Sequence, residues 1–373
     1  MELHIDRDPL QKALARIQTV VERRNIKPIL SHALLEAAGD MLTLTATDEE
    51  VSLRTTCAAE VDAEGSMAVN ARTLFDIVRE LPPSTVHLRA EANNRIRLTC
   101  DRARFDLAGL PADQFPEIQP TGDGERFPFE HSLLSEMLNK THFAMSYDDS
   151  RFSLNGVFLQ FSPAGEGSVE QVRMVATDTH RLAMVEKPIG HGMSETRELI
   201  IPKKAVHEIR RLLNEDSQPV ELILGDTHMQ CIKPEITLVS KLVQGRFPNF
   251  RRVIPQNNNL NLFIGRAALD SVVKRVSVLS HEKSRGIRLL VNGNVAKIFS
   301  NNPEQEAGEE EIQVSFDSDQ EISIGLNARY LREILTAMEG EQVCLSLRDD
   351  QSPILLSDPE KKDAICVLMF MMV

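Results

Sequence analysis

Asp178, His180 and Arg181 lie within one polar segment near the middle of the chain, and side chains of these types can transfer protons or bind metal ions. The same segment also suits a turn, because Asp and Thr side chains accept hydrogen bonds from nearby backbone amides. The sequence contains no G-x-S-x-G, Walker A, G-x-G-x-x-G or H-E-x-x-H pattern. We therefore favour the turn, and we predict no catalytic residue, no metal site and no cofactor.

The residues that flank this turn have the pattern of two apolar strands folded back on each other. The segment 172–185 reads V-R-M-V-A-T-D-T-H-R-L-A-M-V, with the polar residues gathered at its centre. Its core, Ala176-Thr177-Asp178, repeats Ala46-Thr47-Asp48 from much earlier in the chain. This echo indicates that the chain is built from repeats.

Six segments share one pattern, a short strand followed by an amphipathic helix. In the first of them Leu10, Leu14 and Ile17 fall on one helical face, and Asp8 followed by Pro9 indicates the helix start. The predicted helices are Pro9–Val21, Arg72–Glu80, Ser132–His142, Lys203–Asn214, Ala267–Leu279 and Arg329–Met338.

Two similar stretches indicate where the repeats end. The stretch 110–118 reads L-P-A-D-Q-F-P-E-I, the stretch 242–250 reads L-V-Q-G-R-F-P-N-F, and a polar segment that contains Pro follows each. A chain of 373 residues is also too long for one ordinary core. We predict three tandem α+β domains, each with two helices packed on antiparallel sheets, at residues 1–122, 123–254 and 255–373.

The bulk composition is that of an ordinary globular protein, with 42% hydrophobic and 26% charged residues. No apolar run approaches the roughly 20 residues of a membrane span, and the N-terminus lacks the layout of a signal peptide. Five scattered cysteines suggest neither a disulfide framework nor a zinc site. We expect a cytoplasmic protein that does not engage a membrane.

Charge is distributed unevenly along the chain. The formal net charge is −13, yet the six predicted helices together are net positive. One interpretation is that helices tolerate Lys and Arg well. The other is that the helices share a basic face that meets phosphates without reading bases.

Two charged segments could meet in an assembly. Arg102 and Arg104 lie near the end of the first predicted domain, and the third contains an acidic run over residues 304–311. Apolar residues accompany them, and these could form an interface core or could be buried within their own domains. They are Phe105, Leu107, Val278 and Leu279.

Several motifs, in this order along the whole chain, resemble the bacterial DNA polymerase III beta subunit family, the sliding clamps. They are R-F-S-L-N-G at 151–156, A-T-D-T-H-R-L at 176–182, G-R-F-P at 245–248, R-R-V at 251–253, E-K-S-R-G at 282–286 and N-N-P-E-Q-E at 301–306. The resemblance implies a non-catalytic, ring-shaped homodimer. Its helices would line a hole for duplex DNA of any sequence, and its sheets would face outward.

The resemblance also implies three groups of site residues. The positions that match DNA contacts are Arg24, Arg72, Lys204 and Arg252. The positions that match a peptide-binding pocket are Leu154, Thr177, Thr179, His180, Arg181, Leu182, Pro248, Val253, Val367, Leu368, Met369, Phe370, Met371 and Met372. The positions that match the dimer interface are Arg102, Arg104, Phe105, Leu107, Val278, Leu279, Glu304 and Glu306. The implied partners are a clamp loader, the DNA polymerase III alpha subunit and other proteins with clamp-binding motifs.

Some positions depart from the family pattern. Thr179 stands where Gly is common, and the tail 369–373 reads M-F-M-M-V where M-P-M-R-L is usual. Asp148 and Pro353 also differ from the usual residues. These departures leave open an alternative, a divergent clamp paralogue that acts as an interaction hub or resists clamp ligands.

Overall fold

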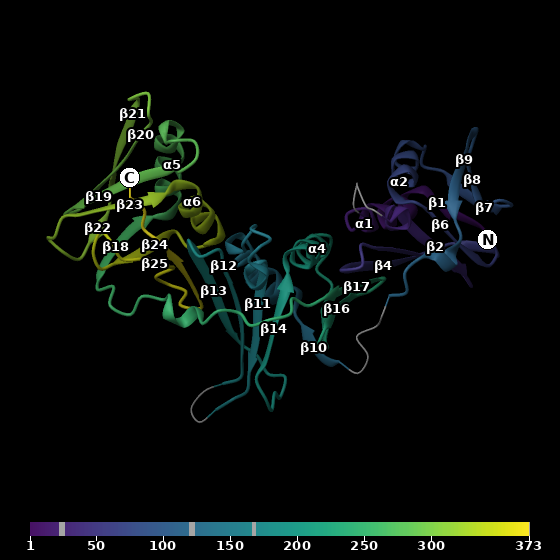
Figure 1. The fold of residues 1–373 in the computed structure, drawn as a ribbon, viewed down its shortest axis with the longest axis horizontal. Coiled ribbons are helices and arrows are strands. Elements are labelled where there is room, and N and C mark those ends of the chain that lie inside the picture. The colour runs from purple at the N-terminus through teal and green to yellow at the C-terminus, as the bar shows by residue number, and fades with distance from the viewer. Residues whose placement is uncertain (22–26, 119–123, 166–168, 373) are drawn as a thin grey trace. The chain divides into compact units, whose positions relative to one another are not determined.

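The computed structural model describes two compact units, each with its own core (Figure 1). The first unit is Met1–Leu134 with Lys204–Leu242, and the second is Ser135–Lys203 with Val243–Val373. The described residues are 1–21, 27–118, 124–165 and 169–372. None of the helices formed by these residues is both long and apolar enough to cross a membrane.

All six predicted helices are present; five directly follow a strand, and α3 follows β10 after one residue. The first begins at Arg7, two residues before the expected start at Pro9, because β1 ends at Asp6 and the chain turns straight into the helix. Pro9 is still tolerated there, since first-turn amides have no partner inside a helix. The helices are α1 (Arg7–Ile17), α2 (Ala71–Glu80), α3 (His131–Asn139), α4 (Lys203–Leu213), α5 (Arg266–Val276) and α6 (Ala328–Ala337).

The first unit contains one 13-stranded sheet, in the order β10-β15-β16-β17-β4-β3-β2-β6-β9-β8-β7-β1-β5. Helix α1 packs against β3, β4 and α2 (Figure 1). The strands are β1 (Glu2–Asp6), β2 (His32–Ala38), β3 (Met41–Thr47), β4 (Val51–Ala58), β5 (Glu60–Ala63), β6 (Gly65–Asn70), β7 (Thr85–Glu91), β8 (Arg95–Cys100), β9 (Ala103–Leu110), β10 (Glu125–Phe129), β15 (Val220–Leu224), β16 (His228–Lys233) and β17 (Ile236–Lys241).

The second unit contains a nine-stranded sheet, β14-β11-β12-β13-β26-β25-β24-β18-β22, and a four-stranded sheet, β21-β20-β19-β23. Helices α5 and α6 pack against each other (Figure 1). The strands are β11 (Gly156–Ser162), β12 (Gln171–Thr177), β13 (Arg181–Pro188), β14 (Arg197–Pro202), β18 (Leu260–Gly265), β19 (Gly286–Asn292), β20 (Val295–Asn301), β21 (Ala307–Gln313), β22 (Ser315–Phe316), β23 (Ile322–Asn327), β24 (Gln342–Leu347), β25 (Ile354–Ser357) and β26 (Ala364–Leu368).

The sheets run across two junctions where strands far apart in sequence pair. At the first junction β4 pairs with β17, with Leu53 opposite Leu238. At the second junction β13 pairs with β26, with Leu182 opposite Val367. Both pairings are antiparallel and join the fourth strand of one repeat to the last strand of the next. The same connection is therefore used twice.

Charged side chains tie helices together at the first junction. Arg16 of α1 is buried and its Nε donates to Glu215 at 2.8 Å. The Thr19 hydroxyl donates to Glu208 of α4 at 2.8 Å. A buried charge is tolerated only where it is paired, so these contacts fix how α1 and α4 meet.

The five cysteines behave as small hydrophobic residues. All five are buried and unpaired. Burial raises the pKa of Cys231 to about 12, and it does the same for Cys366. These thiols are therefore protonated and unreactive at neutral pH.

Candidate functional site

The segment that suggested acid–base chemistry forms the turn of the β12–β13 hairpin. Asp178 Oδ1 accepts the backbone amides of His180 and Arg181, each at 3.0 Å. The Thr177 hydroxyl donates to the carbonyl of Arg181 at 2.6 Å. The Asp and Thr side chains thus hold the local backbone, which confirms the turn interpretation.

The β3–β4 hairpin has the same turn. Asp48 Oδ1 accepts the amides of Glu50 and Val51 at 2.9 and 2.7 Å. The residue after each Asp takes a left-handed backbone, with φ of 73° at Glu49 and 76° at Thr179. The repeat seen in the sequence therefore extends to individual hydrogen bonds.

Arg181 is the most enclosed charged group of the hairpin, with 3% of its surface exposed. Its Nε donates to Asp178 at 3.1 Å, and its other nitrogens donate to Glu333 and to the Phe143 carbonyl. Its guanidinium carbon lies 4.3 Å from the centre of the Tyr330 ring. Arg181 thus fastens the hairpin to α6, with a cation–π contact added to the ion pairs.

Thr179 and His180 are exposed beside Arg181. The His180 ring stacks on Tyr330 with 6.1 Å between ring centres. Arg151 Nη1 donates to the Thr179 hydroxyl at 2.8 Å, and Arg151 Nε lies 3.3 Å from Asp148 Oδ2. Hydrogen bonds from Ser150 hold the pKa of Asp148 below its usual range, so this carboxylate stays charged. Thr179 and Asp148, which both depart from the family pattern, therefore restrain Arg151.

Apolar residues from the predicted pocket gather next to the hairpin. Leu182 and Val367 belong to a buried cluster with Phe158, Ile200 and Phe250. The last three residues also line a hollow of about 640 Å³, where Pro248 forms part of the rim. Elsewhere in the predicted set, Leu154 and Thr177 are buried and Val253 is 43% exposed.

The C-terminal tail runs alongside the same hairpin. Leu368 pairs with Arg181, and the Met369 amide donates to the carbonyl of His180 at 2.9 Å. The Met371 amide donates to the carbonyl of Gly325 at 2.9 Å. Phe370 is half-buried, and Met372 is 95% exposed. Backbone bonds thus place the predicted tail residues beside the predicted turn residues.

A second charged group connects α3 to β13 and to the loop before β26. Lys187 Nζ donates to Glu136 at 2.8 Å, Lys140 pairs with Glu136, and Asp363 pairs with both lysines. Burial alone would raise the pKa of Glu136 and of Asp363, but the lysines outweigh it and hold each pKa below its usual range. The group is therefore ionised at neutral pH.

The four predicted DNA-contacting residues differ in their surroundings. Arg24 lies outside the described residues. Arg72 is exposed and its Nε lies 3.8 Å from Asp76. Lys204 is engaged by Asp48 and by the Val20 carbonyl at 3.0 Å, whereas Arg252 is exposed at the end of a short 3-10 helix.

The predicted interface residues lie on or beside two strands with an open edge. In the part of the chain that the structure describes, β9 pairs along 103–108 only with β8, and β21 pairs only with β20. Arg102, Arg104, Glu304 and Glu306 are exposed. Phe105, Leu107 and Leu279 are half-buried, and Val278 is 76% exposed.

Sequence reasoning missed four residues that surround the hairpin. They are Phe143, Arg151, Tyr330 and Glu333. Arg151 is the first residue of the R-F-S-L-N-G motif, which contributes to the family resemblance. The motif does not indicate that Arg151 bonds to Thr179. The other three come from distant segments, and no local pattern pairs them with Arg181.

Together these features define a binding protein built from repeated strand–helix units, with a hollow beside an apolar cluster and with open strand edges. Among the described residues, no group of three or more His, Cys, Asp or Glu side chains could hold a metal ion. The sequence matches the DNA polymerase III beta subunit in its N-terminal domain at residues 1–119, its central domain at 129–249 and its C-terminal domain at 251–372.

Known proteins resemble the chain over its full length. The beta sliding clamp of Pseudomonas aeruginosa is 37% identical over 371 residues, which cover 99% of each chain. That of Escherichia coli K12 is 35% identical over 370 residues, with 99% of each chain covered. A structure of the Pseudomonas aeruginosa clamp bound to griselimycin covers 100% of both chains at 37% identity, with a TM-score of 0.93.

The chain therefore belongs to the DNA polymerase III beta subunit family. Its function is that of a DNA sliding clamp, a non-catalytic processivity factor. The family matches confirm the three tandem domains and the α+β fold class.

Proposed function

We propose that two copies of this chain close head to tail into a ring around duplex DNA, and that the ring tethers the replicative polymerase to its template. The observation that carries this proposal is the pair of open strand edges. Within the chain, β17 lies between β16 and β4, and β26 lies between β25 and β13. A partner's β21 would complete β9 in the same way, and two such contacts close a ring.

The chemistry of the two edges supports this pairing. Arg102 and Arg104 flank one edge, and the acidic run from Glu304 to Glu311 flanks the other, so opposite charges would meet. Val278 lies 13 residues after Gly265, where β18 ends, and Thr19 lies 13 residues after Asp6, where β1 ends. Thr19 contacts the neighbouring repeat, because its hydroxyl donates to Glu208 of α4. An exposed Val278 thus suits a contact of the same kind with a partner chain.

We place the domains at 1–122, 123–254 and 255–373. The family matches at 1–119, 129–249 and 251–372 support these boundaries. Six such domains in a ring would present twelve helices to the DNA. Arg24, Arg72, Lys204 and Arg252 would make weak phosphate contacts that allow sliding, and Lys204 must first release Asp48 to do so. The ring would act in the cytoplasm.

The second part of the proposal concerns partners. A pocket beside the β12–β13 turn and the tail would bind short peptide motifs of the polymerase III alpha subunit, the clamp loader and other clamp-binding proteins. The apolar cluster around Leu182 and Val367 and the adjacent hollow support this role, since extended peptides anchor through apolar side chains in such sites. Exposed His180 and the tail would form its rim.

Retention on DNA tests the topological mechanism. The protein is loaded on nicked circular DNA by its loader, and half of the sample is then linearised. We expect retention on the circle and rapid loss from the linear form, because a ring slides off a free end. Equal retention on both templates would contradict the proposal. Arg24→Ala should weaken loading while leaving the dimer intact.

A second candidate function, a divergent paralogue that no longer serves the main polymerase, is favoured by the altered tail. The double variant Phe370→Pro, Met372→Arg restores the usual residues. A clamp-binding peptide from the cognate polymerase alpha subunit is titrated against wild type and variant. Comparable binding to both supports the replicative role, whereas binding to the variant alone supports the paralogue.

A further inference from the structure

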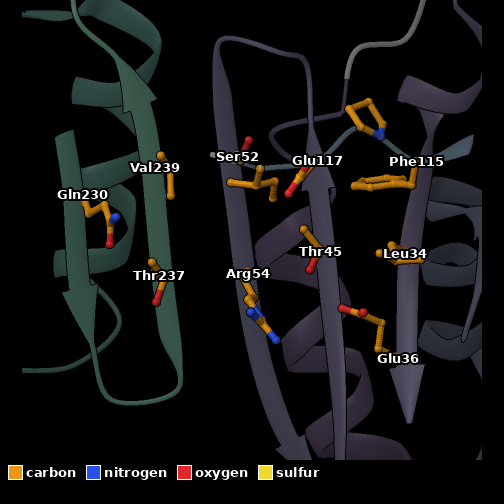
Figure 2. Close-up of a pocket in the computed structure, with 12 residues that line it drawn as sticks. Leu34, Glu36, Thr45, Ser52, Arg54, Phe115, Glu117, Gln230, Thr237 and Val239 are labelled. Atoms are coloured by element: carbon orange, nitrogen blue, oxygen red, sulfur yellow. The ribbon is translucent and has the colours of Figure 1, made fainter. Parts of the chain in front are cut away.

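The first junction contains a hollow that lies on the face of the sheet and outside the sites described above. Its volume is about 490 Å³, and side chains from β2, β3, β4, β16 and β17 line it (Figure 2). Phe115 and Glu117, which follow β9, reach over one end of these strands (Figure 2). Ligand pockets commonly have volumes of roughly 300–1,000 Å³, so the hollow is large enough for a few residues of peptide.

This hollow occupies the place that the apolar cluster fills at the second junction. Ser52 lies opposite Val239 on β17, just as Leu182 lies opposite Val367 on β26. Phe115-Pro116 corresponds to Phe247-Pro248 in the matching stretches that end the first two repeats. The two junctions therefore share one framework and differ in their side chains.

The side chains of the first junction are smaller and more polar than their counterparts. At the second junction the rings of Phe158 and Phe247 stack with 4.9 Å between their centres, where the first has Leu34 and Phe115. The corresponding pairs are Thr45 for Val175, Ser52 for Leu182, Arg54 for Met184 and Ile118 for Phe250. The hollow at the first junction therefore extends over β3, β4 and β17, whereas the hollow at the second does not extend over β12, β13 or β26. The added polarity supplies groups that can bind a ligand.

The charged groups of the hollow are available to a ligand. Among the described residues, the side chains of Arg54, Glu36 and Glu117 make no ion pair or hydrogen bond with the protein. A guanidinium can accept a carboxylate through two parallel hydrogen bonds. A hollow lined by one arginine and two carboxylates is a poor match for nucleic acid, which needs clustered cations. Leu34 and Phe115 lie on one side of the hollow and suit one aliphatic or aromatic side chain (Figure 2).

We infer that this hollow is a second peptide-binding site, which takes a short extended segment with an apolar side chain next to an acidic one. The apolar side chain enters beside Leu34 and Phe115, and the acidic group meets Arg54. The hydroxyl and amide groups of Ser52, Thr237 and Gln230 can bond the backbone of the segment. One chain could then bind two different partners, because the hollow at the first junction offers more polar groups than the proposed pocket at the second.

Selection from a phage-displayed library of random heptapeptides tests the inference on the full-length protein. Selected peptides are synthesised, and their affinities are measured by fluorescence anisotropy against wild type and three variants. Ser52→Trp fills the hollow, Arg54→Glu reverses its charge, and Val253→Asp alters the proposed pocket at the second junction as a matched control. Thermal unfolding and sedimentation verify that each variant folds and assembles. If Ser52→Trp fails to fold, Arg54→Glu still provides the test.

We expect one class of peptides with adjacent apolar and acidic residues. Their binding should weaken at least about tenfold with Ser52→Trp and with Arg54→Glu, and it should be unchanged with Val253→Asp. Replacing the acidic residue of the peptide by its amide should remove the sensitivity to Arg54→Glu. The inference is overturned if no selected peptide behaves this way, including the case in which all respond only to Val253→Asp. That last result would leave the proposed pocket at the second junction intact.

Discussion

Arg151 and Thr179 are joined by a hydrogen bond of 2.8 Å between the guanidinium Nη1 and the threonine hydroxyl. Asp148 restrains the same guanidinium from another side at 3.3 Å. A glycine at position 179 could not make the first bond. Thr179, which departs from the family pattern, thus accepts a hydrogen bond from Arg151 beside the proposed peptide pocket.

Removing the Thr179 hydroxyl should therefore release Arg151 toward ligands. We expect both Thr179→Gly and Thr179→Val to bind an acidic clamp-binding peptide about fivefold more tightly, since a freed guanidinium gains about 1 kcal/mol from a carboxylate. Isothermal titration measures the affinities. Thr179→Val is the matched control, because it keeps the branched side chain at φ 76°. Unchanged affinity in both variants would show that Arg151 does not face the ligand.

Replacing Arg181 should destabilise the second unit. Arg181→Met leaves Asp178 and Glu333 without their cation, and breaking a buried charge network costs about 3–5 kcal/mol. Thermal unfolding measures the loss. The control is Arg348→Met, because Arg348 is 59% exposed and such surface pairs contribute at most about 1 kcal/mol. Equal decreases in melting temperature for the two variants would mean that the buried charge network of Arg181 does not stabilise the second unit.

A charge at Val278 should separate the dimer. Val278→Asp would bury an unpaired carboxylate in the proposed interface, and the dissociation constant should rise about 100-fold, which corresponds to about 2.8 kcal/mol. Sedimentation velocity distinguishes dimer from monomer. Val169→Asp is the control, because Val169 is another exposed valine, at 61%, away from both strand edges. A dimer that survives Val278→Asp would remove this residue from the interface.

Acid should weaken the group formed by Glu136, Lys140, Lys187 and Asp363. The pKa values of both carboxyls are lowered in the folded protein, so their contribution is complete above the ordinary carboxyl pKa of about 4 and is lost as pH falls through the folded values. Lys187→Met raises those folded values. The acid loss should then begin at higher pH, with about 2 kcal/mol lost at pH 7.

Melting temperatures between about pH 3 and 7 follow this effect. Lys27→Met is the control, because the Lys27 side chain is 59% exposed and pairs with Glu49 in the first unit. If the curves of wild type and Lys187→Met run parallel over the whole range, the lysine does not set the acid response of the protein.

The sequence by itself determined the features that arise from neighbouring residues. All six strand–helix units follow from apolar spacing, and the repeated Thr-Asp turn follows from hydrogen bonds between side chains and amides two or three residues away. Such interactions close short loops, so the pattern that specifies them is local. The first helix began two residues early because the preceding strand limited where it could start.

Only the tertiary structure decided what lies opposite these local elements. Tyr330 and Glu333 surround Arg181 from about 150 residues away, and β17 meets β4 after an even longer separation. These partners are set by the packing of whole sheets and helices, which no short pattern encodes. Similar stretches follow β9 and β17, but packing gives them different neighbours. The first borders a hollow that contains charged and hydroxyl side chains, and the second borders an apolar cluster.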